Sequence, residues 1–253
     1  MIFKNPDVAD IPTLKKLWLE AFGDSDEFFM EFIKKGYHQK RCRIAQCNGK
    51  IVSVLYFFDC LCEDKKIAYI YGVTTDKKER GKGYSKALFS DTHKYLSENG
   101  YCGAILVPGE ENLFSFYKKL GYKTCTFVDP ITLTQDEQPP LSLKEINKTE
   151  YGALRREFLI SGSVIQENEN LDFLECFENF YTANGVLLAA HIKDGTLYTQ
   201  EFLGDKALLP SVLAYFNADK GIFRTVGTSR PFAMYYPFYK NSPKPTYFGL
   251  AFD

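Results

Sequence analysis

A glycine-rich, basic turn between a predicted strand and a predicted helix constrains the fold of this 253-residue sequence more than any other feature. Residues 67–75 are largely apolar and predict a buried strand, and apolar residues after position 84 recur with helical spacing. The turn holds the motif Arg80-Gly81-Lys82-Gly83-Tyr84-Ser85. Small residues let backbone N–H groups approach a ligand, and a helix N-terminus adds partial positive charge. The segment therefore predicts an α/β (α+β) fold that binds an anion at this turn.

Two other glycine-rich phosphate loops do not fit this turn. A P-loop needs glycine, four residues and then Gly-Lys-Ser/Thr, but Asp76 stands at the first glycine position and Gly83 follows the lysine. A dinucleotide-binding Gly-x-Gly-x-x-Gly fingerprint fails because Lys86 occupies the third glycine position and because a β-hairpin precedes the turn. Neither interpretation accounts for the motif.

The sequence on both sides of the turn predicts further strands and helices. Asn48-Gly49 joins two strand-like stretches and is a strong signal for a two-residue hairpin. The other predicted elements are helices at 10–22 and 24–36, hairpin strands at 41–47 and 50–62, a strand at 104–108, a helix over 113–120, and a final strand or hairpin at 122–134. We therefore expect a central mixed β-sheet flanked by helices.

Two motifs in this first half resemble those of one superfamily. Arg80 to Ser85 resembles the Gln/Arg-x-x-Gly-x-Gly/Ala loop of the GNAT N-acetyltransferases, with Ser85 in place of the usual glycine or alanine. The segment from Phe116 to Tyr122, FYKKLGY, is similar to the superfamily's "FYxxLGF" segment. The order of predicted elements also looks like the GNAT order. The resemblance implies a catalytic domain that binds acetyl-CoA over residues 1–138.

The resemblance also implies where acetyl-CoA, the co-substrate, would lie. Its pantetheine arm would pass between strands 67–75 and 104–108, bonded by the backbone of Val73, Thr74 and Thr75. An amide N–H directed at the acetyl carbonyl would stabilise the negative charge that develops when an amine attacks. The remaining residues implied in cofactor binding are Arg80, Gly81, Lys82, Gly83, Tyr84, Ser85, Lys86 and Asn112.

Tyr117 is the residue that the resemblance implies as catalytic. In many GNAT enzymes a tyrosine at this place protonates the leaving thiolate, whereas the periodicity alone would favour a core aromatic residue. No general base is evident in the sequence. The acidic candidates for this base lie between the first two predicted helices and are Asp24, Asp26 and Glu27. Their competing role is to cap a helix. We expect His38 and His93 to be ordinary surface or packing residues.

The second half, residues 139–253, repeats the predicted order of helices, hairpin, helix and strands. Helices are predicted at 150–160, 170–184 and 206–216, and hairpin strands at 186–192 and 196–202. The residues Leu203-Gly204-Asp205-Lys206 lack the run of glycine and basic residues that would bind phosphate. We infer a degenerate second GNAT-like domain, similar to the tandem arrangement of some bacterial acetyltransferases. In that group the terminal carboxylate can act as the general base. The resemblance therefore makes Asp253 a second catalytic candidate. The alternative is that Asp253 is simply a solvent-exposed chain end.

Composition narrows the classes of protein further. The net charge is −1, which argues against non-specific binding to nucleic acid or to a membrane surface. The seven cysteines are scattered without a CxxC pair, so no metal site is expected. The N-terminus does not resemble a signal peptide, and no apolar run reaches 18 residues. We expect a cytoplasmic protein, and the aromatic content of 16% is compatible with a homo-oligomer.

Two functions agree with these observations. The first is an acetyl-CoA-dependent N-acetyltransferase that transfers the acetyl group directly to a primary amine of a small molecule or peptide. The alternative is a non-catalytic acyl-CoA-binding or regulatory module, which the missing base would permit. A purely structural protein would require the turn at 80–85 to be an ordinary surface loop.

Overall fold

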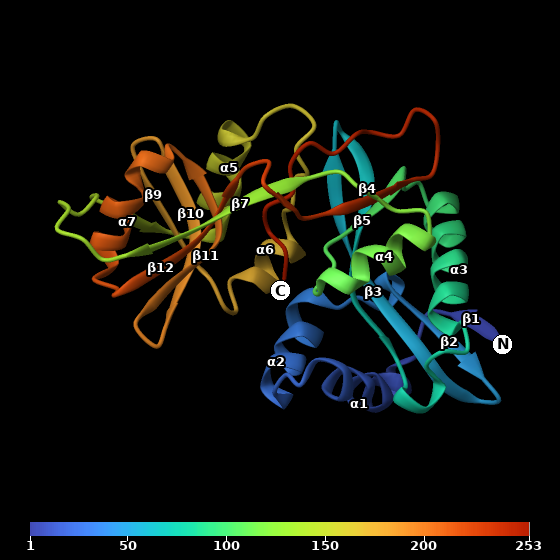
Figure 1. Cartoon of the computed structure of the whole chain (residues 1–253). Helices are drawn as coiled ribbons and strands as arrows, with labels where there is room; N and C mark the ends of the chain where they lie inside the picture. Colours follow the sequence, from blue (N-terminus) through green and yellow to red (C-terminus); the bar gives the residue numbers. More distant parts are fainter. Residues whose placement is uncertain (253) are drawn as a thin grey trace. The chain divides into compact units, whose positions relative to one another are not determined.

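The computed structural model describes residues 1–252, which divide into two compact units, each built on a seven-stranded sheet (Figure 1). Unit 1 comprises Met1–Lys123 together with Met234–Pro243. Unit 2 comprises Thr124–Ala233 and the segment that begins at Lys244. Both sheets are mixed: β4 and β5 pair in parallel in the first and β11 and β12 in the second, and other pairs in each sheet are antiparallel. The expected mixed sheets with flanking helices are therefore confirmed.

The sheet of unit 1 has the order β1-β2-β3-β4-β5-β14-β6. Its strands are β1 (Ile2–Lys4), β2 (Cys42–Cys47), β3 (Lys50–Cys62), β4 (Lys65–Thr75), β5 (Gly103–Leu106), β6 (Lys123–Thr124) and β14 (Met234–Pro237). The helices are α1 (Ile11–Phe22), α2 (Asp26–Glu31), α3 (Tyr84–Glu98) and α4 (Glu111–Lys119). Asn48 and Gly49 form the turn between β2 and β3 with φ of 49° and 77°, as the hairpin signal predicts.

The two faces of this sheet bury different sets of side chains, because side chains alternate along β3. Tyr56 and Phe58 point to the face covered by α1 and α2, where they join Trp18 and Phe32. Leu55 and Phe57 belong to the opposite face, in one buried cluster with residues of α3 and α4: Leu88, Phe89, Leu96 and Tyr117. Each helix pair therefore has its own layer of core.

The sheet of unit 2 has the order β13-β7-β12-β11-β10-β9-β8. Its strands are β7 (Phe127–Thr134), β8 (Lys144–Ile146), β9 (Asn179–Ala183), β10 (Val186–Lys193), β11 (Thr196–Gly204), β12 (Lys220–Val226) and β13 (Arg230–Pro231). The helices are α5 (Lys148–Phe158), α6 (Glu169–Leu174) and α7 (Leu209–Phe216). Helix α7 begins with Pro210 in its first turn, a position where the missing N–H costs nothing.

A buried polar network lies inside unit 2. The Glu201 carboxylate accepts hydrogen bonds from Arg155 at 2.7 and 2.9 Å, from Tyr151 at 2.6 Å and from Tyr247 at 2.9 Å. Glu201 and Arg155 are almost fully buried, so the pair neutralises charges that would otherwise be costly there. The network ties the C-terminal segment, through Tyr247, to β11 and α5. Phe252, the last described residue, is buried against Phe173.

The two halves of the chain exchange strands, which differs from the sequence-based expectation. We expected residues 122–134 to complete the first sheet and the first domain to end at 138. Strand β7 instead pairs antiparallel with β12 in the sheet of unit 2. Its place in the first sheet is taken by β14, which pairs with β5 from Met234↔Leu106 to Pro237↔Gly103.

The predicted helix at 170–184 is also wrong. Helix α6 ends at Leu174, and Asn179–Ala183 forms strand β9 instead. Phe180, Tyr181 and Thr182 have the aromatic and β-branched side chains that favour strands. The missed signal is Asn184-Gly185, the two-residue turn that joins β9 to β10.

No helix within the described part of the chain is long and apolar enough to cross a membrane.

Candidate active site

Strand β4 contains a bulge just before its C-terminal end. Tyr71 pairs with Tyr56 and Thr74 pairs with Val54, so Gly72 and Val73 together face Leu55. A bulge leaves one residue outside the regular ladder and bends the strand. Gly72 adopts φ of +58°, which a residue with a side chain rarely tolerates. The bulge therefore gives the backbone at Val73 an orientation that regular β4 pairing would not.

Strands β4 and β5 separate at the same level. Their parallel register consists of two pairs, Ala68↔Ala104 and Tyr69↔Ile105. Strand β4 continues to Thr75, whereas β5 ends at Leu106 and pairs there with β14. The bulge and Val73–Thr75 thus lie beyond the level at which β5 pairs with β4. The resemblance implies that an extended ligand passes between β4 and β5 at this level.

The glycine-rich turn leads from β4 into α3 with its backbone uncovered. Gly81 and Gly83 have φ of +78° and +80°, and no atom lies within 4 Å of where a Cβ would stand on either. Gly83 is the N-cap of α3, and no side chain caps the helix there. The first N–H groups of a helix have no intrahelical acceptor. Those of Tyr84, Ser85 and Lys86 are therefore available to an anion.

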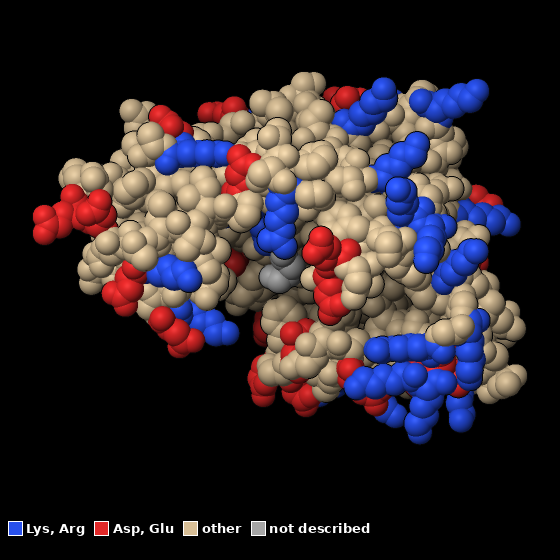
Figure 2. Space-filling view, in the orientation of Figure 1, with Lys and Arg blue, Asp and Glu red and all other residues tan. Residues whose placement is uncertain are grey.

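Five cationic side chains lie in or beside this turn. Lys77, Lys78, Arg80, Lys82 and Lys86 are all exposed. Figure 2 shows Lys and Arg side chains gathered at the lower right of the view, over the turn between β4 and α3.

Two of these cationic side chains are held in place by contacts with nearby residues. Arg80 Nε donates to the Thr75 carbonyl at 3.2 Å, and Lys82 Nζ lies 2.8 Å from Glu79. The hydrogen bond to Glu79 raises the pKa of Lys82. The turn is thus both open and positively charged, which suits a phosphate ligand.

Tyr117 lies on α4, facing the sheet. Its ring contacts Phe89 at 5.8 Å, Phe116 at 5.2 Å and Tyr122 at 6.0 Å, measured between centroids. Burial raises the pKa of Tyr117 to about 12, so the hydroxyl is protonated at neutral pH. A protonated phenol beside an apolar face is suited to donate a proton to an anion.

The structure brings several of the predicted residues to one face of the sheet. Val73 and Tyr84 both pack against the buried cluster that contains Tyr117. Tyr84 also donates from its hydroxyl to Cys47 Sγ at 3.6 Å, which ties the start of α3 to β2. Asn112 is exposed in the first turn of α4, where its Nδ2 donates to Glu110. No hydrogen bond joins Asn112 to the glycine-rich turn among the described residues.

The acidic candidates for a general base have structural partners. Asp24 accepts a hydrogen bond from Trp18 Nε1 at 2.7 Å, and Asp26 pairs with Lys15 at 2.6 Å. The expected capping by these carboxylates is wrong, because Ser25 caps α2 by accepting from the Phe28 N–H. Glu27 is exposed, and a hydrogen bond to its own backbone lowers its pKa. Asp253 lies outside the described residues.

Both histidines singled out in unit 1 have the ordinary roles that we expect. His38 Nδ1 accepts from the Lys40 N–H at an exposed turn. His93 is held 2.8 Å from the Tyr122 hydroxyl, and burial lowers its pKa to about 4. His93 is therefore a neutral packing residue.

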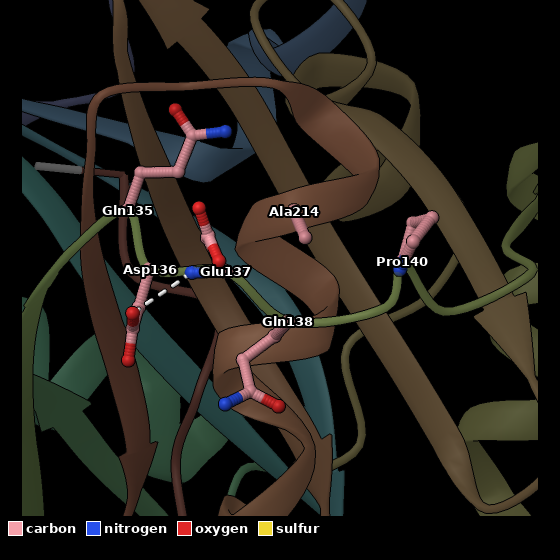
Figure 3. Close-up of a pocket in the computed structure, with 6 residues that line it drawn as sticks. All are labelled: Gln135, Asp136, Glu137, Gln138, Pro140 and Ala214. Carbon is pink, nitrogen blue, oxygen red and sulfur yellow. Dashed lines mark hydrogen bonds between the residues drawn. The ribbon is translucent and has the colours of Figure 1, made fainter.

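A shallow cavity of about 440 Å³ lies in unit 2 (Figure 3). It is lined by Gln135, Asp136, Glu137, Gln138, Pro140 and Ala214. None of the predicted site residues contributes to it. In the described part of the chain, no group of three or more His, Cys, Asp or Glu side chains is arranged to hold a metal ion.

Comparison with protein families decides how this site is interpreted. A family model described as an acetyltransferase (GNAT) domain matches residues 3–125. These residues form a GNAT acetyltransferase domain. The match covers β4, the glycine-rich turn, α3 and α4, so it includes both motifs. GNAT proteins bind acetyl-CoA or CoA, and the family assignment supports acyl transfer as the activity of this unit.

Solved structures extend the similarity of the fold beyond that GNAT domain. A GCN5-related N-acetyltransferase from Anabaena variabilis aligns with a TM-score of 0.74 at 15% identity, over 92% of this chain and 72% of the other. A GCN5-related N-acetyltransferase from Kribbella flavida aligns with a TM-score of 0.72 at 13% identity, over 92% of this chain and 70% of the other. Eis1 from Mycobacterium abscessus aligns with a TM-score of 0.66 at 11% identity, over 93% of this chain and 73% of the other. At such identities the likeness concerns the fold. No curated protein matches the sequence significantly.

Two features of the site were absent from the sequence-based prediction. One is the bulge at Gly72, for which an isolated glycine inside a strand pattern is the available signal. The other is the bond between Trp18 and Asp24, which joins residues six positions apart and has no pattern of its own.

Proposed function

We propose that the chain is an acetyl-CoA-dependent N-acetyltransferase that acetylates a primary amine of a small molecule or peptide. The observation that carries the proposal is the uncovered, positively charged turn at the N-terminus of α3, next to the gap between β4 and β5. Gly81 and Gly83 would let N–H groups approach the pyrophosphate, and Arg80 and Lys82 would add charge. Asn112 would contact the cofactor from α4.

The backbone of Val73 to Thr75 would hold the pantetheine arm and the acetyl carbonyl. An N–H directed at the carbonyl oxygen stabilises the charge that develops there, and removing such a donor often costs about 2.7–4 kcal/mol of transition-state stabilisation. The bulge supports this role because it takes the backbone of Gly72 and Val73 out of the regular pairing with β3.

The transfer itself is a direct attack in a ternary complex. The amine nitrogen forms a bond to the acetyl carbon, and the bond between that carbon and sulfur breaks. The leaving thiolate takes the proton of the Tyr117 hydroxyl, and the amine loses one proton to a base. With a pKa of about 12, the Tyr117 hydroxyl carries its proton throughout the physiological range, which is the protonation state that a general acid needs before transfer. Asp253 is our candidate for the base.

Unit 2 would be a degenerate GNAT domain. Its segment β11–α7–β12 has the same strand–helix–parallel strand order as β4–α3–β5. The connection before α7 holds one cation, Lys206, and that side chain is bonded to Asp129 at 2.7 Å. This supports a domain that keeps the fold without a phosphate site.

A non-catalytic acyl-CoA-binding module is the second candidate. It is favoured by the carboxylates of Asp24 and Asp26, which already serve Trp18 and Lys15 rather than a substrate.

A screen of amines separates these two functions. The purified chain is incubated with acetyl-CoA and amines of several classes, including polyamines, amino acids and peptides with a free N-terminus. Thiol release is followed, and acetylated product is identified by mass. Matched release and product support the enzyme. Saturable acetyl-CoA binding without product on any amine supports the module.

A further inference from the structure

The bulge in β4 rests on the side chain of Trp18. A Cβ placed on Gly72 would lie 2.7 Å from Trp18 Cζ3 and 2.9 Å from Tyr56 Cδ2. The indole ring therefore touches the bulge backbone, and only glycine fits between them. Trp18 is 1% exposed, so no solvent separates the ring from the strand.

Trp18 is held in one orientation. Its ring contacts five aromatic rings with centroids between 4.7 and 5.6 Å away: Phe22, Phe29, Phe32, Tyr56 and Tyr71. Its one polar atom, Nε1, donates to Asp24 Oδ2 at 2.7 Å. A hydrogen bond to a carboxylate is stronger than one between neutral groups. Rotation of the ring would break that bond and displace several packed neighbours.

A second contact joins α1 to the strand just after the bulge. Thr74 Oγ1 lies 3.4 Å from the Leu17 carbonyl, and Thr74 is buried. Leu17 and Trp18 are neighbours in α1, so one turn of this helix contacts β4 on both sides of Val73. The geometry of the bulge is thus set by α1 as well as by the sheet.

We propose that Trp18 and Asp24 are positioning residues, which hold the bulge so that the Val73 N–H meets the acyl carbonyl. This inference rests on the proposed function, since it requires an acyl-CoA in the gap beside β4. Asp24 belongs to the turn between α1 and α2. Through Trp18 its carboxylate controls a backbone donor that it does not touch itself.

The position of one N–H donor is measurable without an acceptor amine. Acetyl-CoA presents a carbonyl oxygen, whereas its thioether analogue S-ethyl-CoA lacks that oxygen and has nearly the same size. The ratio of their dissociation constants therefore reports the hydrogen bond to the carbonyl. A typical net hydrogen bond corresponds to a preference of about three- to tenfold for acetyl-CoA.

The test compares this ratio by calorimetry in the full-length chain and in its variants. Asp24→Leu removes the acceptor of the indole N–H, and Trp18→Phe removes the ring area beneath Gly72. In both we expect the ratio to fall to about one, while affinity for free CoA stays within about twofold, because the turn at 80–85 is untouched. Asp24→Asn keeps an acceptor oxygen and should restore the preference.

Asp26→Leu is the matched control. It removes the carboxylate of the first residue of α2, two positions from Asp24, and that carboxylate contacts Lys15 rather than Trp18. The ratio of this variant should therefore equal that of the unmodified chain. Thermal unfolding verifies that each variant is folded, and Asp24→Leu decides the result if Trp18→Phe does not fold. A preference that survives in Asp24→Leu, or is absent from the unmodified chain, overturns the inference while CoA binding leaves the proposed function standing. No binding of CoA or acetyl-CoA to the unmodified chain overturns both.

Discussion

Tyr236 stacks on His93, with ring centroids 4.4 Å apart and planes inclined by 25°. Tyr236 belongs to β14 and His93 to α3, so the contact joins segments that lie more than 100 positions apart in the sequence. A Cβ on Gly121 would lie 2.6 Å from the Tyr236 ring, which shows how closely the end of the α4 segment packs against it. The GNAT unit is therefore completed by residues from the second half of the chain.

Replacing Tyr236 with alanine should destabilise unit 1. The change removes the ring that covers His93 and leaves a partly filled space, for which we expect a loss of about 1–3 kcal/mol. Urea unfolding followed by Trp18 fluorescence measures this, because Trp18 is the one tryptophan and lies in unit 1. Tyr239→Ala is the control, since Tyr239 is 47% exposed. An equal effect of both variants would contradict the importance of β14.

Tyr117→Phe should lower turnover without weakening acetyl-CoA binding. Loss of a positioned general acid typically reduces the rate by about 10²- to 10⁴-fold. The pKa of about 12 means that the acid form is fully present at lower pH and is lost as the pH rises through 12. Tyr117 should therefore produce no descending limb in the rate between pH 6 and pH 9.

Tyr122→Phe is the matched control for this prediction. Tyr122 is buried in the same cluster and bonds His93, so its loss should affect stability rather than turnover. Equal turnover of Tyr117→Phe and the unmodified chain on a productive amine would remove Tyr117 from the mechanism.

His93 should make unit 1 less stable in mild acid. Its folded pKa of about 4 lies below the ordinary value of 6.5, so the unfolded chain binds the proton more tightly. The free energy of unfolding should be unaffected above pH 6.5 and should fall as the pH drops toward 4, by up to about 3 kcal/mol.

His93→Gln should flatten that dependence between pH 4 and 6.5 in urea unfolding followed by Trp18. The exposed His38 provides the control, and His38→Gln should leave the pH dependence unchanged. An unaltered slope in His93→Gln would show that other groups cause the loss of stability.

Glu201→Leu should destabilise unit 2 strongly. The substitution leaves the Arg155 guanidinium buried without its carboxylate and removes the acceptor of Tyr151 and Tyr247. Breaking a buried pair on one side typically costs about 3–5 kcal/mol. Thermal unfolding followed by circular dichroism should show a clear loss, whereas Glu167→Gln, at the exposed pair with Arg156, should cost less than about 1 kcal/mol. A similar result for both variants would contradict the structural role of the network.

Local patterns were sufficient to predict most elements and the glycine-rich turn. The Asn48-Gly49 hairpin, helix α1 ending at Gly23, and the glycine-rich entry into α3 each depend on residues close together in sequence. The exchange of β7 and β14 had no such signal. The pairing of each of these strands is decided by a partner far along the chain, about 90 positions away for β7 and about 130 for β14.

As with the fold, the parts of the candidate site that depend on local motifs were predictable, and those that depend on contacts between elements were not. The turn at 80–85 and Tyr117 follow from motifs, and the structure places Tyr84, Val73 and Tyr117 around one cluster. An isolated glycine in the strand pattern is the one local signal for the bulge at Gly72. The contact of that bulge with Trp18 comes from a different element and has no local signal. The partners of Asp24 and Asp26 likewise come from α1, which is why capping was the wrong expectation.

Binding of acetyl-CoA to a variant of the glycine-rich turn tests the central claim most directly. Gly83→Asp would place a carboxylate at the N-terminus of α3, where the pyrophosphate is expected, and should weaken binding about 100-fold or more in calorimetry. Gly100→Asp is matched to it, since Gly100 follows the other end of α3 with φ of +84° and open space around its Cβ position. The account predicts stoichiometric binding by the unmodified chain and by Gly100→Asp, and none by Gly83→Asp at the same concentrations. Equal binding by both variants would contradict the placement of acetyl-CoA at this turn.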